Sequence, residues 1–228
     1  MFRVVLFDID GTLIRTHGAG VKAFAQSFAN GFGLPDATRN VSFAGRTDRG
    51  LAHDILLENG LEPNENNIQK VFEGYLAGLD EHLPSDHHIP LPGVLDWLKS
   101  LSLLPDPPQI ALLTGNLPLG AEKKLTHFDL WHNFPWGAFG DHYTDRDDVA
   151  RHALKLARKH CGHQIYGEDV LIIGDTPRDI QCARVIEARV LAVATGDFSC
   201  TDLESHNPDW LASDLTQISP KDLSLSKI

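Results

Sequence analysis

Residues 2–13 read Phe-Arg-Val-Val-Leu-Phe-Asp-Ile-Asp-Gly-Thr-Leu, a short apolar run that ends in two acids and a glycine. Such a run is typical of a strand that is covered on both faces, as in a parallel sheet. The carboxyl ends of strands form the ligand crevice of an open α/β sheet. Asp8 and Asp10 stand at this end, on one side of an extended segment, and Gly11 permits a sharp turn behind them. The stretch predicts an α/β fold with an acidic site at the end of its first strand.

Three later apolar runs resemble the first one and lie at Gln109 to Leu113, Val170 to Ile173 and Val190 to Ala194. Between and beside these runs, apolar residues recur at helical spacing in residues 94–104, 118–128, 146–160 and 177–188. Parallel strands need crossover connections, and helices of this length provide them. The pattern predicts a doubly wound, mostly parallel sheet.

About 100 residues separate the first two apolar runs, far more than one crossover needs. Helical patterns at residues 18–32, 47–59 and 64–82 fill much of this interval. We therefore expect a helical cap domain at residues 18–84, inserted into a core made of residues 1–17 and 85–228. Glycines at the first border and prolines at the second would serve as hinges.

Composition narrows the choice of partners and location. The 228 residues hold 20 basic and 31 acidic side chains, a net charge of −11, which opposes binding to nucleic acid or to an anionic membrane. No apolar stretch approaches the roughly 20 residues that span a bilayer. The three cysteines are too few and too scattered for a disulfide scaffold, which favours a reducing compartment. We expect a cytoplasmic protein.

Two further motifs follow predicted strands: Leu112-Leu113-Thr114-Gly115-Asn116, and residues 172–179, Ile-Ile-Gly-Asp-Thr-Pro-Arg-Asp. Alone, each could be a polar turn. Together with residues 7–13 they resemble the signature of the haloacid dehalogenase-like superfamily. The resemblance is to its phosphatase branch with a helical cap after the first motif, as in phosphoglycolate phosphatases and β-phosphoglucomutases.

The resemblance implies that Asp8 is a nucleophile that forms an aspartyl-phosphate. Asp10 would protonate the leaving alcohol and later activate water. A carboxylate can attack phosphorus, and a second carboxyl can exchange protons if its pKa lies nearer neutrality. Mg²⁺ would be held by Asp8, the Asp10 carbonyl and Asp175, because this ion prefers oxygen ligands. Thr114 and the amides of Gly115 and Asn116 would bind the transferring phosphoryl oxygens.

Three assignments stay open at this stage. The third motif of the family is a basic residue, for which Arg146 is our candidate and Arg151 and Lys155 are neighbouring alternatives. Asp179 is either a supporting acid beside the metal or the third residue of a capped helix start. Arg46, in the segment Ala44-Gly45-Arg46-Thr47-Asp48, either binds substrate or is solvated.

These expectations combine into a Mg²⁺-dependent phosphatase that acts on a small phosphorylated metabolite, phosphoglycolate or a sugar phosphate, as a monomer or homodimer. Phosphoglycolate phosphatases commonly carry Asp-Ser where this chain has Arg15-Thr16. The alternatives are a phosphomutase of the β-phosphoglucomutase type, which would use the same acids, and a non-catalytic regulator with this fold. A regulator would not need Asp8, Asp10 and Asp175 together.

Overall fold

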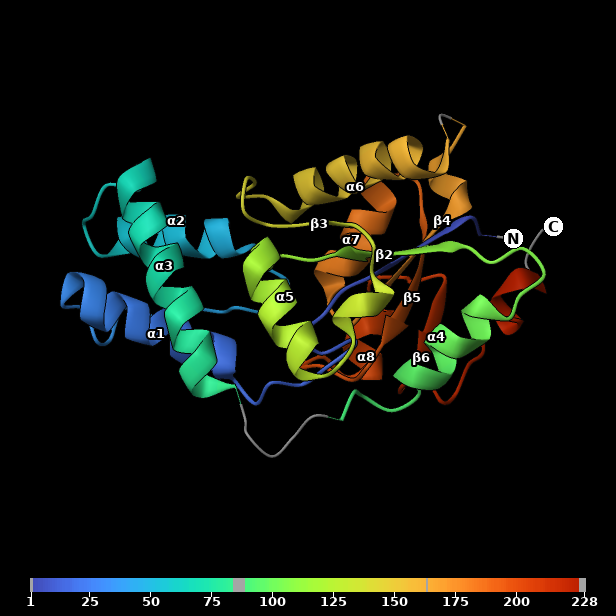
Figure 1. Ribbon diagram of the computed structural model, residues 1–228, viewed down its shortest axis with the longest axis horizontal. Coiled ribbons are helices and arrows are strands. Elements are labelled where there is room, and N and C mark those ends of the chain that lie inside the picture. The colour runs from blue at the N-terminus through green and yellow to red at the C-terminus, as the bar shows by residue number, and fades with distance from the viewer. Residues whose placement is uncertain (1, 84–88, 163, 226–228) are drawn as a thin grey trace.

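The computed structural model describes residues 2–83, 89–162 and 164–225. Figure 1 shows two parts: three helices gather at the left, and a sheet with its flanking helices fills the right. The second predicted border of the cap, at residues 84 and 85, lies outside the described residues.

The sheet has six strands, all parallel, in the order β3-β2-β1-β4-β5-β6. The strands are β1 (Val4–Phe7), β2 (Gln109–Leu113), β3 (Gly137–Ala138), β4 (Val170–Gly174), β5 (Arg189–Val193) and β6 (Trp210–Ala212). The α/β, doubly wound fold is confirmed. The sequence patterns predicted four strands, however, and missed β3 and β6, which are too short to show a pattern.

Helices cover both faces of the sheet. They are α4 (Val94–Ser102), α5 (Pro118–His127), α6 (Arg146–Cys161), α7 (Pro177–Val185) and the short α8 (Cys200–Glu204). Because side chains alternate along a strand, Val5 and Phe7 of β1 pack in the layer that contains α4 and α5. Val4 and Leu6 pack in the opposite layer with α6 and α7.

The remaining helices α1 (Ala19–Phe32), α2 (Asp48–Glu58) and α3 (Glu65–His82) form a separate apolar core. Phe24, Phe28 and Tyr75 are at most 1% exposed within it. We call these three helices and the segments that join them the cap. Leu117 of the sheet domain also packs into this cluster, so the cap rests on the loop after β2.

The order of the strands indicates where the predicted ligand crevice lies in the sheet. Strands β2 and β3 lie on one side of β1, whereas β4, β5 and β6 lie on the other. The order in which successive strands are added to the sheet therefore reverses at β1. The carboxyl ends of β1, β2 and β4 surround this topological switch point, where ligands bind in such sheets. None of the described helices combines the length and apolar character needed to cross a bilayer.

Candidate active site

Asp8 is the first residue after β1, and its backbone N–H donates to the carbonyl of Ile173 at 3.0 Å. Its side chain is nearly inaccessible and lies 3.0 Å from a guanidinium nitrogen of Arg146. Burial raises the pKa of Asp8 to about 6, because desolvation disfavours the charged form more than Arg146 favours it. The site thus holds a poorly solvated carboxylate with one fixed counter-charge.

Arg146 begins α6 and bridges two acids. Its Nη2 lies 2.5 Å from Asp179 Oδ1 as well as near Asp8. Burial disfavours its charge, but Asp179 and Asp8 raise the pKa of Arg146, so it stays protonated. Of the three basic residues considered for this role, Arg146 is the one that contacts Asp8. Arg151 pairs with Asp148 at the surface, and Lys155 is exposed.

Asp175 follows β4 in the motif that ends the strand and opens α7. The hydroxyl of Thr12 donates to its Oδ1 at 2.9 Å. Gly11, at φ 82°, lies so close that a Cβ there would be 2.3 Å from Asp175 Oδ2. The turn after Asp10 therefore needs glycine twice over, for its positive φ and for the close approach of the acid.

Asp179 has the helix-capping role that was one of its two open interpretations, and its role beside a metal stays a prediction. Its Oδ2 accepts from the backbone N–H of Thr176 at 3.0 Å and from the Thr176 hydroxyl at 2.7 Å, which completes a capping box with Pro177 as the first helical residue. Its Oδ1 faces Arg146. One carboxylate therefore starts α7 and holds the buried guanidinium.

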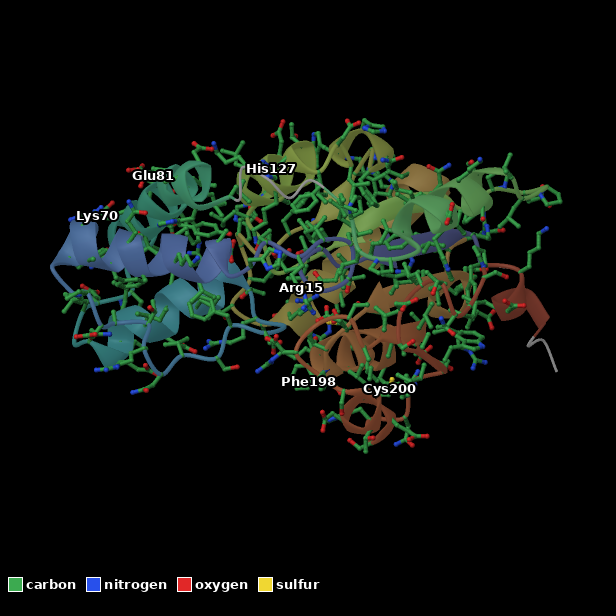
Figure 2. All side chains as sticks on the ribbon, turned by 90° about the horizontal axis from the view of Figure 1, so that it is seen from below. Arg15, Lys70, Glu81, His127, Phe198 and Cys200 are labelled. Carbon is green, nitrogen blue, oxygen red and sulfur yellow. The ribbon has the colours of Figure 1, made fainter. Side chains whose placement is uncertain are left out.

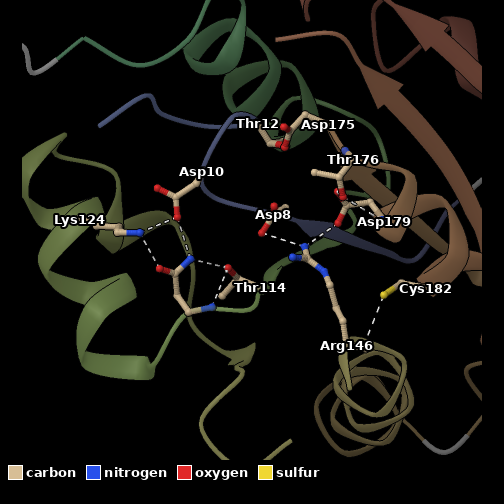
Figure 3. A network of polar contacts seen from close by, with 11 residues as sticks. Asp8, Asp10, Thr12, Thr114, Lys124, Arg146, Asp175, Thr176, Asp179 and Cys182 are labelled. Atoms are coloured by element: carbon tan, nitrogen blue, oxygen red, sulfur yellow. Dashed lines mark hydrogen bonds and ion pairs between the residues drawn. The ribbon is translucent and has the colours of Figure 1, made fainter. Parts of the chain in front are cut away.

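Oxygen atoms of Asp8, Asp175 and Asp179 all lie within 4.8 Å of one another (Figure 3). Arg146 pairs with Asp8 and Asp179 of this group, and burial together with the charges of Asp179 and Asp8 raises the pKa of Asp175 well above its ordinary value. An oxygen-only set with excess negative charge fits a hard divalent cation such as Mg²⁺. The residues present can hold the metal that the resemblance implies.

The Asp10 carboxylate has partners of its own, apart from this acid group. Its Oδ2 accepts from Lys124 Nζ at 2.6 Å and from Asn116 Nδ2 at 2.9 Å. Asn116 Nδ2 also donates to the hydroxyl oxygen of Thr114 at 2.8 Å. Asn116, one of the residues expected to bind phosphoryl oxygens, therefore links Asp10 to Thr114 (Figure 3).

Lys124 was missed by sequence reasoning. It lies on α5, and its buried helical neighbours are Gly120, Ala121 and Leu125. A lysine on the apolar face of an amphipathic helix was the available signal, since lysine is rarely buried without a partner. The side chain is 4% exposed and is paired with Asp10.

Arg46 does not lie free in solvent. Its guanidinium pairs with Asp54 and donates to the carbonyl of Gly50 at 3.2 Å, both within the cap. Arg46 also lines the cavity described below, and its carbonyl would lie 1.9 Å from a Cβ at Gly115. The cap backbone is thus pressed against the loop that carries Thr114.

Cap and core meet through several hydrogen bonds around Asp48. Its backbone N–H donates to the Gly115 carbonyl at 2.7 Å, and its Oδ2 accepts from the N–H of Leu117 at 2.7 Å. Arg49 N–H donates to the carbonyl of Gly140 at 3.1 Å. Burial raises the pKa of Asp48 to about 7, and the charge of Lys124 opposes this shift. The structure is a closed arrangement of cap on core.

A cavity of about 330 Å³ lies between the two parts. The predicted acids Asp8, Asp10 and Asp175 line the core side, and Phe24, Phe43 and Tyr75 line the cap side. Arg15 also lines it and lies between cap and core in Figure 2. The Arg15 guanidinium donates to the carbonyl of Thr195. The cavity thus joins the reactive acids to a largely apolar cap wall.

Comparison with known families decides the assignment. A model of the haloacid dehalogenase-like hydrolases matches residues 5–193 of this chain. The chain belongs to this family. The predicted family is confirmed, as is the predicted enzyme class, a hydrolase among phosphatase relatives.

Two sequence relatives and one solved structure illustrate the similarity. Phosphoglycolate phosphatase 1 of Pseudomonas aeruginosa is 27% identical over 227 residues, which cover 96% of this chain and 79% of that protein. The phosphoglycolate phosphatase of Nitrosococcus oceani is 25% identical over 221 residues, with 94% of each chain covered. CbbY from Rhodobacter sphaeroides, solved in complex with phosphate, has a TM-score of 0.74 at 17% identity and covers 99% of this chain and 100% of its own. This last likeness concerns the fold.

Proposed function

We propose that this hydrolase is a Mg²⁺-dependent phosphatase that cleaves a small phosphate monoester through a phosphoaspartate. The observation that carries the proposal is the placing of two acids from one turn in one cavity, where they take different partners. Asp8 lies beside Arg146 among the grouped carboxylates, and Asp10 lies beside Lys124. In our proposal, Asp8 attacks phosphorus and Asp10 transfers the protons.

The first half-reaction would transfer the phosphoryl group to the protein. An Asp8 carboxylate oxygen forms a bond to phosphorus while the bond from phosphorus to the ester oxygen breaks. The protonated Asp10 gives its proton to that oxygen, so the alcohol leaves neutral. Bound Mg²⁺ would reduce the repulsion between the Asp8 carboxylate and the phosphate dianion. Arg146 and Thr114 would hold the other phosphoryl oxygens.

The second half-reaction would restore the enzyme. The Asp10 carboxylate takes a proton from a water molecule while the water oxygen forms a bond to phosphorus. The bond from phosphorus to Asp8 breaks, and inorganic phosphate leaves. The backbone hydrogen bonds of Asp48 and Arg49 hold the cap against the core, and this contact would limit the access of bulk water while the phosphoryl group moves.

Phosphoglycolate or a sugar phosphate is the substrate that we propose. The relatives named phosphoglycolate phosphatase support the first, and the cavity of about 330 Å³ has room for the second. Arg15 and the cap residue Arg46 line the cavity and are candidates to meet a second anionic or hydroxyl group of such a substrate. We keep the cytoplasm as the expected location, since the three cysteines are free thiols.

The decisive experiment compares the wild type with Asp8→Asn on p-nitrophenyl phosphate in the presence of Mg²⁺. We expect the variant to lose at least about 1000-fold in kcat while its circular dichroism spectrum and cooperative thermal unfolding show that it remains folded. Asp129→Asn is the matched control, because the side chain of Asp129 is fully exposed. Equal rates for Asp8→Asn and the wild type would overturn the proposal. With a bisphosphorylated sugar, released inorganic phosphate supports hydrolysis and an isomerised product supports the mutase.

A further inference from the structure

Lys124 places an ammonium group at a buried position, where a charge is energetically unfavourable. The residue is 3% exposed and lies on a face of α5 whose other buried members are uncharged. An ammonium group is tolerated there only when it is paired and hydrogen-bonded. A methionine would fill similar space without this cost, so the charge itself needs an explanation.

The contacts of Lys124 converge on one oxygen of Asp10. Nζ donates to Asp10 Oδ2 at 2.6 Å and to Asn116 Oδ1 at 2.7 Å. Asn116 then donates from its Nδ2 to the same Asp10 Oδ2 at 2.9 Å. Two donors, themselves hydrogen-bonded to each other, thus hold a single carboxylate oxygen (Figure 3).

The second oxygen of Asp10, Oδ1, is available to a ligand. Within residues 2–83, 89–162 and 164–225, the hydrogen bonds and the ion pair of this carboxylate are made by Oδ2, and Oδ1 makes none. The side chain is 39% exposed and lines the cavity. A carboxyl group held by one oxygen, with the other unengaged, is arranged to exchange a proton with a ligand.

Lys124 also lies at the border between core and cap. A Cβ built on Gly20 of α1 would be 3.5 Å from Lys124 Nζ. The buried cap acid Asp48 experiences the charge of Lys124, and it is tied to the same core segment through the N–H of Leu117. The environment that holds the ammonium group is therefore completed by the closed cap.

We propose that Lys124 is a positioning residue that fixes the carboxyl group of Asp10 toward the ester oxygen of the substrate. The inference rests on the proposed phosphatase function. In the step that it supports, Asp10 gives its proton to the ester oxygen as the bond from phosphorus to that oxygen breaks and the bond to Asp8 forms. Lys124 acts through its hydrogen bond to Asp10 and takes no part in the transfer itself. The competing role is direct contact of Nζ with a phosphoryl oxygen, since Lys124 also lines the cavity.

Two substrates of nearly the same shape separate these roles. p-Nitrophenolate leaves without a proton, whereas the phenolate of phenyl phosphate holds its proton with a pKa of about 10, like a tyrosine. Loss of proton transfer should therefore slow the cleavage of phenyl phosphate much more. The quantity to compare is kcat/KM, because it reports the transfer to Asp8 and excludes the later attack of water.

The variant is Lys124→Met and its matched control is Lys123→Met. Lys123 precedes it on the same helix and forms a partly exposed ion pair with Asp80. We expect Lys124→Met to lower the ratio of kcat/KM for phenyl phosphate over p-nitrophenyl phosphate by roughly 10- to 100-fold, within the range of general acid catalysis. Lys123→Met should leave the ratio unchanged. Asp10→Asn should lower it similarly, and adding Lys124→Met to Asp10→Asn should then change it little.

Other outcomes overturn the inference. An equal loss on both esters assigns Lys124 to phosphate binding or to folding alone. If Lys124→Met does not fold, Lys124→Gln keeps a donor at this position and carries the same test of the ratio. A wild type that cleaves neither ester contradicts the proposed function and the positioning role together, whereas an active wild type with an unchanged ratio in the variant contradicts only the role of Lys124.

Discussion

Asp8 and Asp10 are two residues apart in the chain, yet each faces a cation from a different helix. Asp8 lies 3.0 Å from Arg146 of α6, and Asp10 lies 2.6 Å from Lys124 of α5. Asp8 is buried among acids, whereas Asp10 is partly exposed to the cavity. Different surroundings are the means by which two like carboxyls acquire different chemical roles.

The first prediction separates the two half-reactions. Asp10→Asn should still transfer the phosphoryl group from p-nitrophenyl phosphate to Asp8, because nitrophenolate needs no proton to leave. Attack by water should then be slow, since no carboxylate takes its proton. We expect a burst of about one equivalent of nitrophenolate followed by a rate at least about 100-fold below that of the wild type.

Stopped-flow absorbance measures the burst, and intact-mass analysis shows the added phosphoryl group. The Asp8→Asn variant provides the control and should show neither. A steady rate without a burst, at the level of the wild type, would contradict the role assigned to Asp10.

The second prediction concerns the metal. A ligand that binds only the folded state stabilises it, by about 2.7 kcal/mol at 100 times its dissociation constant. Saturating Mg²⁺ should therefore raise the free energy of unfolding of the wild type by about this amount. Asp175→Asn removes one of the three grouped carboxylates and should lose most of the gain. Urea unfolding with Mg²⁺ or with a chelator measures it.

The exposed variant Asp129→Asn should keep the full Mg²⁺ effect, since the side chain of Asp129 is fully exposed and is not one of the grouped acids. The metal assignment fails if Mg²⁺ stabilises Asp175→Asn as strongly as it stabilises the wild type.

The third prediction concerns Arg146. Its removal leaves Asp8 and Asp179 buried without their counter-charge, and breaking a buried pair in this way commonly costs about 3–5 kcal/mol. We expect Arg146→Met to lower the free energy of unfolding by about 3 kcal/mol in the presence of chelator. Arg151→Met, on the same helix but at the surface, should change it by less than about 1 kcal/mol.

Denaturant unfolding of both variants under identical conditions is the measurement. Equal, small changes would show that Arg146 does not balance the acids.

The fourth prediction uses the buried cap acid Asp48, whose pKa burial raises to about 7. The folded state then binds its proton more tightly than the unfolded state, where an aspartate has a pKa of about 3.9. Stability falls with rising pH wherever the folded state binds more protons. The contribution of Asp48 should thus decline between about pH 4 and about pH 7 and stay low above that.

Asp48→Asn keeps an oxygen for the N–H of Leu117 but does not titrate. Relative to the wild type, the variant should be more stable at pH 8 than at pH 5 by on the order of 2 kcal/mol. Urea unfolding at the two pH values gives this difference. A difference that does not change with pH, or that changes in the opposite direction, would refute the prediction.

Local patterns in the sequence predicted much of the fold. The apolar runs predicted β1, β2, β4 and β5 because a strand buried on both faces must be apolar throughout. Strand β3, Gly137–Ala138, carries no such pattern, since two residues are too few to show one. It is a strand because the backbone beside Leu112 and Leu113 offers it partners.

The residues of the site likewise fall into those that the sequence predicted and those that needed the tertiary structure. Asp8, Asp10, Thr114 and Asp175 were candidates because they lie at or just beyond the ends of predicted strands, within motifs that resemble those of the family. Parallel strands bring such ends together. The choice of Arg146 over Arg151 and Lys155 depended on which face of α6 meets the sheet. Lys124 was hidden because its partner Asp10 is more than a hundred residues away.

By itself, the sequence determined the α/β class, the inserted helices and the acids at the strand ends, because these depend on short-range periodicity and on motifs. The tertiary structure alone decided which cation faces which acid, the contacts of Asp179 with both Arg146 and Thr176, and the burial of Asp48 and Lys124. Charge pairing and desolvation act through space between segments far apart in the chain, so no local pattern specifies them.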